Sequence, residues 1–206
     1  MRTLTLIFVF LLAFASLPLR ADEPGQFDYW LLSLSWSPQY CENRENDQQC
    51  QRPYAFVVHG LWPQKDRGYP EDCGSGGERV SRELVERMLP LMPSPRLIQH
   101  EWRSHGTCSA LGIEDYFLTI ERVRRDLNIP SAYTDPTQYL STTADDITGA
   151  FAQANPGLGA EDMILICAGH YLKEVRICYG KDFKFQICGV NQRSHCGHQI
   201  VLRPSR

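Results

Sequence analysis

Hydrophobic residues follow a two-residue alternation near the start of the chain. Between Phe27 and Trp36, aromatic and aliphatic residues alternate with polar ones, and Pro38 follows. A short apolar run, Ala55–Val58, then reaches His59 and a glycine. Both patterns are typical of β-strands. We expect the second strand to be central in a sheet and to present His59 where it passes into a glycine turn.

The middle of the chain instead shows the periodicity of amphipathic helices. In Glu114–Leu127 the apolar residues recur at helical spacing before Pro130. Ser81–Leu89 begins with a capping residue and stops at a proline. The pattern predicts four helices, over residues 81–89, 97–107, 114–127 and 144–154.

From Met163 onward the pattern returns to that of strands separated by glycine and charged turns. Four strands are expected here: Met163–Cys167, Val175–Tyr179, Phe183–Cys188 and Ile200–Leu202. Helices in the middle and strands at both ends predict an α+β fold with a mostly antiparallel central sheet and several helices packed around it. We expect one domain over residues 22–206.

The first residues resemble a secretory signal peptide. Arg2 is followed by an uncharged, mostly apolar run from Thr3 to Leu19, too short for a typical bilayer span. Residues 1–21 are therefore interpreted as a signal, with cleavage after Ala15 or Ala21. We expect an exported protein, periplasmic or extracellular, that does not stay in the membrane after signal removal.

Eight cysteines follow this segment, and an even count in an exported chain favours disulfides. Four bridges are expected, and the sequence pattern does not select their pairing. The competing interpretation is zinc, for which the tight cluster of His195, Cys196 and His198 is the one candidate outside the histidine-rich segments.

The charge balance argues against a protein that binds DNA through a globally positive surface. The chain has 21 basic and 24 acidic residues, a net charge of -3. Removal of residues 1–21 takes away Arg2 and Arg20 and brings the charge to -5. Nucleic acid remains a candidate substrate if it is held at a local site.

Two segments concentrate the chemistry, Phe56–Gln64 and His100–Cys108, and together they hold three of the six histidines. The second contains His100-Glu101 and His105, which differs from the zinc-protease pattern because its histidines are five residues apart. On a regular helix that spacing rotates the second by about 140° from the first. A metal site built from His59, His100 and His105 remains an alternative, but we expect no metal and no cofactor.

Three imidazoles and a carboxylate suit acid–base catalysis. One imidazole can be neutral while another is protonated at mildly acidic pH. Cleavage of RNA by its own 2′-OH needs this combination: a base for the hydroxyl and an acid for the departing 5′-oxygen. The competing interpretation, structural histidines, explains their concentration poorly.

The segments F-V-V-H-G-L-W-P-Q and H-E-W-R-S-H-G-T-C resemble the two active-site segments of the ribonuclease T2 family. Phe27–Trp30 with the following Trp36-Ser37-Pro38 and Cys41, and Leu172–Cys178, are similar to further family strands. Within this family, the chain resembles the bacterial exported ribonucleases of broad specificity. This resemblance implies an endoribonuclease that cleaves single-stranded RNA rather than DNA. A monomer is expected.

The resemblance also implies roles for individual residues. His105 matches the general base and His59 the general acid, although spacing alone does not distinguish the two. His100 matches a phosphate-binding histidine and Glu101 a residue beside the phosphoryl oxygens. Trp62 matches an aromatic residue that binds a base, with a core position as its alternative. The implied disulfides are Cys41–Cys50, Cys73–Cys108, Cys167–Cys196 and Cys178–Cys188.

One position departs from the family pattern. Relatives commonly have a lysine where this chain has Ser104. Arg103 points about 200° away from Glu101 on a regular helix and is not expected to replace it. We expect weaker transition-state stabilisation or a cation supplied from elsewhere. The alternative is a secreted RNA-binding or toxin-like protein with weak catalysis.

Overall fold

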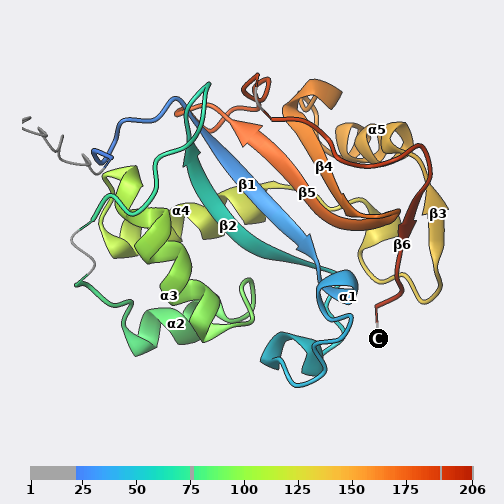
Figure 1. Ribbon diagram of the computed structural model, residues 1–206, viewed down its shortest axis with the longest axis horizontal. Helices are drawn as coiled ribbons and strands as arrows, with labels where there is room; N and C mark the ends of the chain where they lie inside the picture. Colours follow the sequence, from blue (N-terminus) through green and yellow to red (C-terminus); the bar gives the residue numbers. More distant parts are fainter. Residues whose placement is uncertain (1–21, 75–76, 191, 206) are drawn as a thin grey trace, which may run out of the picture.

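The computed structural model describes residues 22–74, 77–190 and 192–205 (Figure 1). The expected signal peptide, with both of its candidate cleavage sites, lies outside these residues. Within the described ranges, no helix combines the length and the apolar character that crossing a membrane requires.

Six strands form one sheet, which confirms the expected α+β class. Their order is β2-β1-β5-β6-β3, and β4 pairs with β5 off this path. Every pairing is antiparallel except that of β5 with β6. The strands are β1 (Tyr29–Trp36), β2 (Phe56–Gln64), β3 (Leu140–Thr142), β4 (Met163–Ala168), β5 (Tyr171–Tyr179) and β6 (Ile200–Leu202).

Helices lie around this sheet, and α2, α3 and α4 gather beside β2 in Figure 1, whereas α5 lies on the side of β4. Side-chain caps begin three of them: Ser81, Ser94 and Thr143 each accept a hydrogen bond from a first-turn N–H. The helices are α1 (Ser37–Tyr40), α2 (Arg82–Met88), α3 (Pro95–Ser104), α4 (Ile113–Asp126) and α5 (Ala144–Ala154). The four expected helices correspond to α2–α5.

Strand β1 is buried on both faces, and its two faces have different roles. Trp30, Leu32, Leu34 and Trp36 belong to the main core, together with side chains of α4 and α5. The opposite face carries Leu31 in a smaller cluster, with Ser33 and Ser35 also buried. Because alternate residues of a strand point to opposite faces, one face anchors the helices and the other is left for chemistry.

The prediction for β2 was wrong in two respects. Strand β2 lies at the edge of the sheet rather than at its centre. It also continues through Gly60 and Pro63 instead of turning at the glycine. Proline is tolerated in an edge strand because one side of that strand has no neighbour, so the missing N–H costs no hydrogen bond between strands. His59-Gly60 therefore lies within a strand.

The expected strand Phe183–Cys188 was also wrong. This segment has one isolated bridge, between Tyr179 and Phe185, and Phe183 adopts a positive φ of 62°. The Cys178–Cys188 disulfide closes a loop of ten residues here. The positive φ of Phe183 interrupts the extended backbone at the start of this segment, which agrees with the single bridge to β5.

Four disulfides hold the fold together, and their pairs are those implied by the family resemblance: Cys41–Cys50, Cys73–Cys108, Cys167–Cys196 and Cys178–Cys188. Cys196 is therefore oxidised, so the cluster with His195 and His198 lacks the thiolate that a zinc site would use. Cys73–Cys108 ties the loop before α2 to the segment that follows α3.

We expect removal of Cys73–Cys108 to destabilise the protein more than removal of Cys41–Cys50. The two bridges span 35 and 9 residues. Loop-closure entropy then gives losses of about 4 and about 2.5 kcal/mol. Urea unfolding of the two paired Cys→Ala variants measures this difference, and equal losses would contradict it.

Candidate active site

A β-bulge positions His59. In the pairing of β1 with β2, Ser33 faces Gly60 and Leu34 faces Val58, so His59 is the extra residue. Bulges bend a strand and re-aim a side chain, and they are common beside active sites. The His59 side chain is 34% exposed and faces two carboxylates, Glu101 and Glu174.

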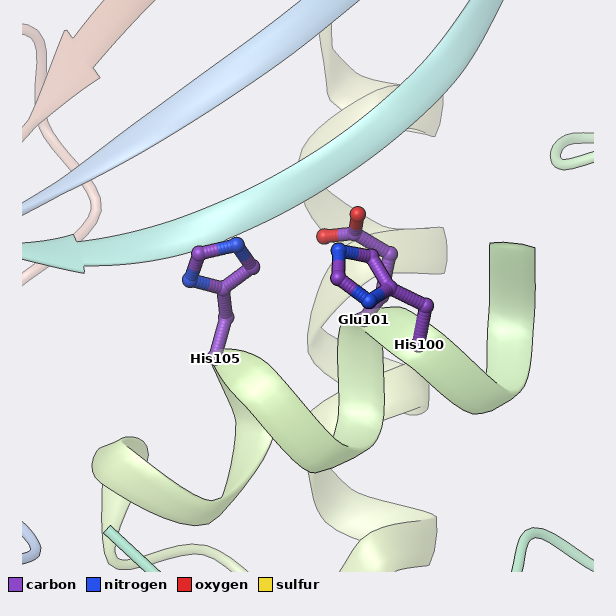
Figure 2. Close-up of side chains that lie close together, drawn as sticks. All are labelled: His100, Glu101 and His105. Atoms are coloured by element: carbon purple, nitrogen blue, oxygen red, sulfur yellow. The ribbon is translucent and has the colours of Figure 1, made fainter. Parts of the chain in front are cut away.

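Helix α3 carries the second group of site residues. His100 and Glu101 lie in its last turns, and His105 ends it with a φ of -125°. The prediction of one helix through residue 107 was wrong at this point, because the chain leaves α-helical geometry at His105. Figure 2 shows the side chains of His100, Glu101 and His105 directed toward the same space below β2.

The Glu101 carboxylate is fully buried, and its position depends on β2. Its Oε2 accepts a hydrogen bond of 2.7 Å from the indole N–H of Trp62. A side chain on Gly60 would collide with this carboxylate and with the indole nitrogen. Glycine at position 60 therefore allows the helix and the edge strand to meet. Among the described residues, Oε1 of Glu101 has no hydrogen-bond partner.

Burial shifts the pKa values of Glu101 and His105 toward their neutral forms. It raises the pKa of Glu101 to about 7, against the opposing effects of the His59 charge and the Trp62 hydrogen bond. It lowers the pKa of His105 to about 4, assisted by the charges of His100 and His59. The neutral form of His105 is therefore favoured at mildly acidic pH.

His59 has the opposite electrostatic setting. Burial acts to lower its pKa, but the hydrogen bond with Glu174 and the charges of Glu101 and Glu174 outweigh burial and raise it. The His59 Nδ1 is 3.3 Å from Glu174 Oε1, and its Nε2 is 3.8 Å from Glu101 Oε1. The charged form of His59 is therefore favoured relative to that of an ordinary histidine.

Sequence reasoning missed Glu174 and Arg176, which β5 brings to the site. Glu174 is 2% exposed and accepts hydrogen bonds from Ser33 and Arg176. Burial acts to raise its pKa, but the bonds from His59 and Arg176 lower it to about 2. A glutamate and an arginine two residues apart in the predicted strand were the available signal, because such residues share one face.

Trp62 and His100 complete the site. The Trp62 ring lies 5.2 Å from the His59 ring and 5.3 Å from that of His105, with the Arg176 guanidinium 5.0 Å from its centre. Trp62 is half-buried rather than part of the core, whereas Trp102 is a core residue. Burial, then the charges of Arg103 and His59, lower the pKa of His100.

The missing lysine has no direct substitute at its own position. Ser104 is buried, and its carbonyl accepts a hydrogen bond from the Asp72 N–H. Arg103 points away from Glu101, but its long side chain reaches His100 Nδ1 at 3.3 Å. A helical-wheel angle describes where a side chain starts and not how far it extends. Arg103, against His100, and Arg176, over the Trp62 ring, are two cations that lie beside the site.

His100, Glu101 and His105 are also the residues here that could hold a metal ion. One ligand atom of each lies within 4.8 Å of the others. This set contains Glu101 in place of His59, unlike the histidine set considered from the sequence. A buried carboxylic acid with a raised pKa is a poor metal ligand until it ionises. An activity assay with a metal chelator distinguishes metal binding by these side chains from metal-independent acid–base chemistry.

Comparison with known proteins gives the context for this site. A model of the Ribonuclease T2 family matches residues 27–188. A ribonuclease of Aeromonas hydrophila is 34% identical over 187 residues, which cover 88% of this chain and 86% of the relative.

Two solved structures share the fold. An RNase-related protein from Calystegia sepium has a TM-score of 0.71 at 21% identity, covering 90% of this chain and all of that one. RNase NT in complex with 5′-AMP has a TM-score of 0.64 at 24% identity, covering 86% of this chain and 98% of that one. The fold is thus one found among ribonucleases.

The family model matches well over half of the sequence, so this chain belongs to the ribonuclease T2 family. It is an RNA-cleaving enzyme of that type.

We expect Gly60→Ala to lower kcat for RNA cleavage at least about 100-fold, because displacement of the Glu101 carboxylate by an ångström is costly. Steady-state kinetics measures the loss, and circular dichroism checks folding. Gly149→Ala is the matched control: it meets no atom within 4 Å in α5 and should leave kcat unchanged. Near wild-type kcat for Gly60→Ala would contradict the predicted collision.

We expect Glu174→Gln to move the basic limb of the kcat/KM profile to lower pH. The substitution removes the negative charge that favours protonated His59, so the acid form is lost earlier as pH rises. Glu174→Asp keeps the charge and should restore the limb. An unmoved basic limb with a changed melting temperature would mean that Glu174 is only structural.

Proposed function

We propose that the chain is an exported endoribonuclease that cleaves single-stranded RNA by metal-independent acid–base transesterification. The observation that carries the proposal is the opposite environment of two neighbouring imidazoles. His59 lies between two carboxylates, whereas His105 is partly buried beside the His100 ring, with no carboxylate paired to it among the described residues. The RNA-cleaving class follows from family membership, and the roles below are our assignment.

In the first step, neutral His105 takes the proton from a ribose 2′-OH. The 2′-oxygen forms a bond to the adjacent phosphorus, and the bond from phosphorus to the 5′-oxygen of the next nucleotide breaks. Protonated His59 gives its proton to that leaving oxygen. The products are a 2′,3′-cyclic phosphate and a 5′-hydroxyl, and no covalent enzyme intermediate forms. Positioned acids and bases of this kind contribute about 10²–10⁴-fold each.

Glu101 and His100 are assigned to the phosphoryl oxygens. Glu101 Oε1 lacks a hydrogen-bond partner among the described residues, and burial raises the pKa of its carboxyl to about 7, toward the neutral form, so that Glu174 is the anion that favours protonated His59. A neutral carboxyl can donate a hydrogen bond to a non-bridging oxygen as charge develops there. His100 is exposed at the same opening and adds a second donor when protonated.

Broad base specificity is supported by Gln64. This residue lies two positions after Trp62 in β2 and is 3% exposed. Its Oε1 accepts a hydrogen bond from Gln192, and its Nε2 donates to the Pro63 carbonyl. The amide is thus engaged within the protein and does not read a base edge. Trp62 would stack on any base, since every base has a π-face.

Export is supported by the hydrophobic N-terminal segment and by four disulfides. We propose a mature domain of residues 22–206 that acts as a monomer in the periplasm or the extracellular medium.

Incubation with RNA and with DNA in excess EDTA, over a range of acidic to neutral pH, tests this proposal. We expect cleavage of RNA alone, with 2′,3′-cyclic phosphate ends, and losses of about 10²–10⁴-fold in His59→Ala and His105→Ala. Gln199→Ala, in a polar contact with Ser141 outside the site, should cleave like wild type.

Loss of cleavage in EDTA with recovery on adding a divalent ion would favour the metal alternative at His100, Glu101 and His105. Cleavage of DNA would rule out attack by a 2′-OH. RNA that binds but stays intact would favour the weakly catalytic binding protein.

A further inference from the structure

A groove lined by arginines adjoins the active site. It has a volume of about 780 Å³ and is lined by Arg79, Arg96 and Arg103, with His100 at the site end. We call it the arginine groove. Tyr40, Ser94 and Leu97 also line a smaller pocket of about 370 Å³ that contains His59. The smaller pocket therefore borders the arginine groove at these three residues, and we call it the connecting pocket.

The arginine groove is cationic in an acidic protein. None of Arg79, Arg96 and Arg103 forms an ion pair with a carboxylate in the part of the chain that the structure describes. Asp47 is the acidic residue of the lining, and its carboxylate accepts hydrogen bonds from Tyr40 and Gln49. Unpaired guanidinium groups are suited to phosphate, which they bind in a bidentate manner.

The arginines are carried by ordered backbone. The Gln99 side chain on α3 accepts a hydrogen bond from the Val80 N–H and donates one to the Val80 carbonyl, at 3.1 and 2.8 Å. This double contact fixes the loop that carries Arg79 against α3. Arg96 lies in the first turn of α3, which Ser94 caps. The backbone under these arginines is thus in place before a ligand binds, and only the side chains have to be ordered on binding.

The position of the groove relative to His59 and His105 indicates which side of the cleaved bond the groove would bind. His59 lines the connecting pocket, whereas His105 and Trp62 line neither hollow. In the proposed function, His59 protonates the 5′-oxygen of the departing nucleotide and His105 acts on the ribose that is retained. RNA that continues past the leaving oxygen would enter the connecting pocket and then the groove.

We infer that the arginine groove binds backbone phosphates of RNA on the 3′ side of the cleaved bond, beyond the first departing nucleotide. The direction of this binding rests on the proposed function, whereas the affinity for phosphates rests on the groove itself. The enzyme then favours sites with RNA downstream and cleaves short fragments and 3′-terminal bonds more slowly.

The test uses strands with a single ribonucleotide in an otherwise 2′-deoxy backbone, so that each has one cleavable bond. One strand extends by several deoxynucleotides on the 3′ side, and the other extends equally on the 5′ side. Both have the same length and charge. We expect higher kcat/KM for the 3′-extended strand at low salt. If Arg79 and Arg96 contact two phosphates, this advantage should fall about sevenfold from about 50 to about 200 mM salt.

The variant Arg79→Ala/Arg96→Ala should lose the advantage of the 3′-extended strand and keep wild-type kcat/KM on a dinucleotide. Both side chains are exposed, so its melting temperature should match that of wild type. Arg125→Ala is the control: this exposed arginine lies on α4, pairs with Asp126 and is not part of the groove. It should retain the advantage.

Equal kcat/KM for the two extended strands in wild type would overturn the inference. So would a double variant that slows both strands and the dinucleotide alike. If no strand is cleaved, the proposed function fails, and fluorescence anisotropy with an all-deoxy strand then tests the groove by itself. Equal affinity of wild type and the double variant in that measurement would overturn phosphate binding as well.

Discussion

The buried carboxylate of Glu101 is the group on which the geometry of the site depends. It fixes the approach of α3 to the edge strand β2, because it contacts the indole of Trp62 through a gap that only glycine at position 60 leaves open. The backbone carbonyl of the same residue accepts the N–H of His105 where the helix ends. One residue thus joins the strand that carries His59 to the helix that ends at His105.

The pKa values of His59 and His105 differ because their surroundings differ, since both side chains are the same imidazole. His59 projects from a bulge toward Glu101 and Glu174, so its charged form is stabilised. His105 is enclosed beside His100 and has no described partner for its Nδ1, so its neutral form is favoured. Two groups with similar intrinsic pKa values are thereby separated, as acid and base catalysis at one pH requires.

Much of the fold could be predicted because the periodicities of α4, α5 and β1 are strong and local. The errors occurred where tertiary context decided the outcome. Glycine and proline in β2 indicate a turn, but an edge strand with a bulge accommodates both. The segment after β5 has a strand-like composition, but Phe183 adopts a positive φ there and the segment forms a single bridge to β5.

The site residues on β2 and α3 could be predicted because they lie in two dense segments of sequence. Glu174 and Arg176 could not be predicted, because β5 is far from β2 in the sequence and no local pattern shows that both strands flank β1. The sheet order places β1 between these strands, so the contact of Glu174 with His59 spans 115 residues of sequence. The pKa of His59 therefore depends on a long-range contact that only the folded chain provides.

The most direct test of this account is an NMR titration of the histidine rings in the wild-type protein, with assignments from His59→Ala and His105→Ala. The account predicts that His105 titrates near pH 4 and that His59 titrates above its ordinary value of about 6.5. If instead His105 holds its proton to higher pH than His59, the assignment of base and acid is contradicted.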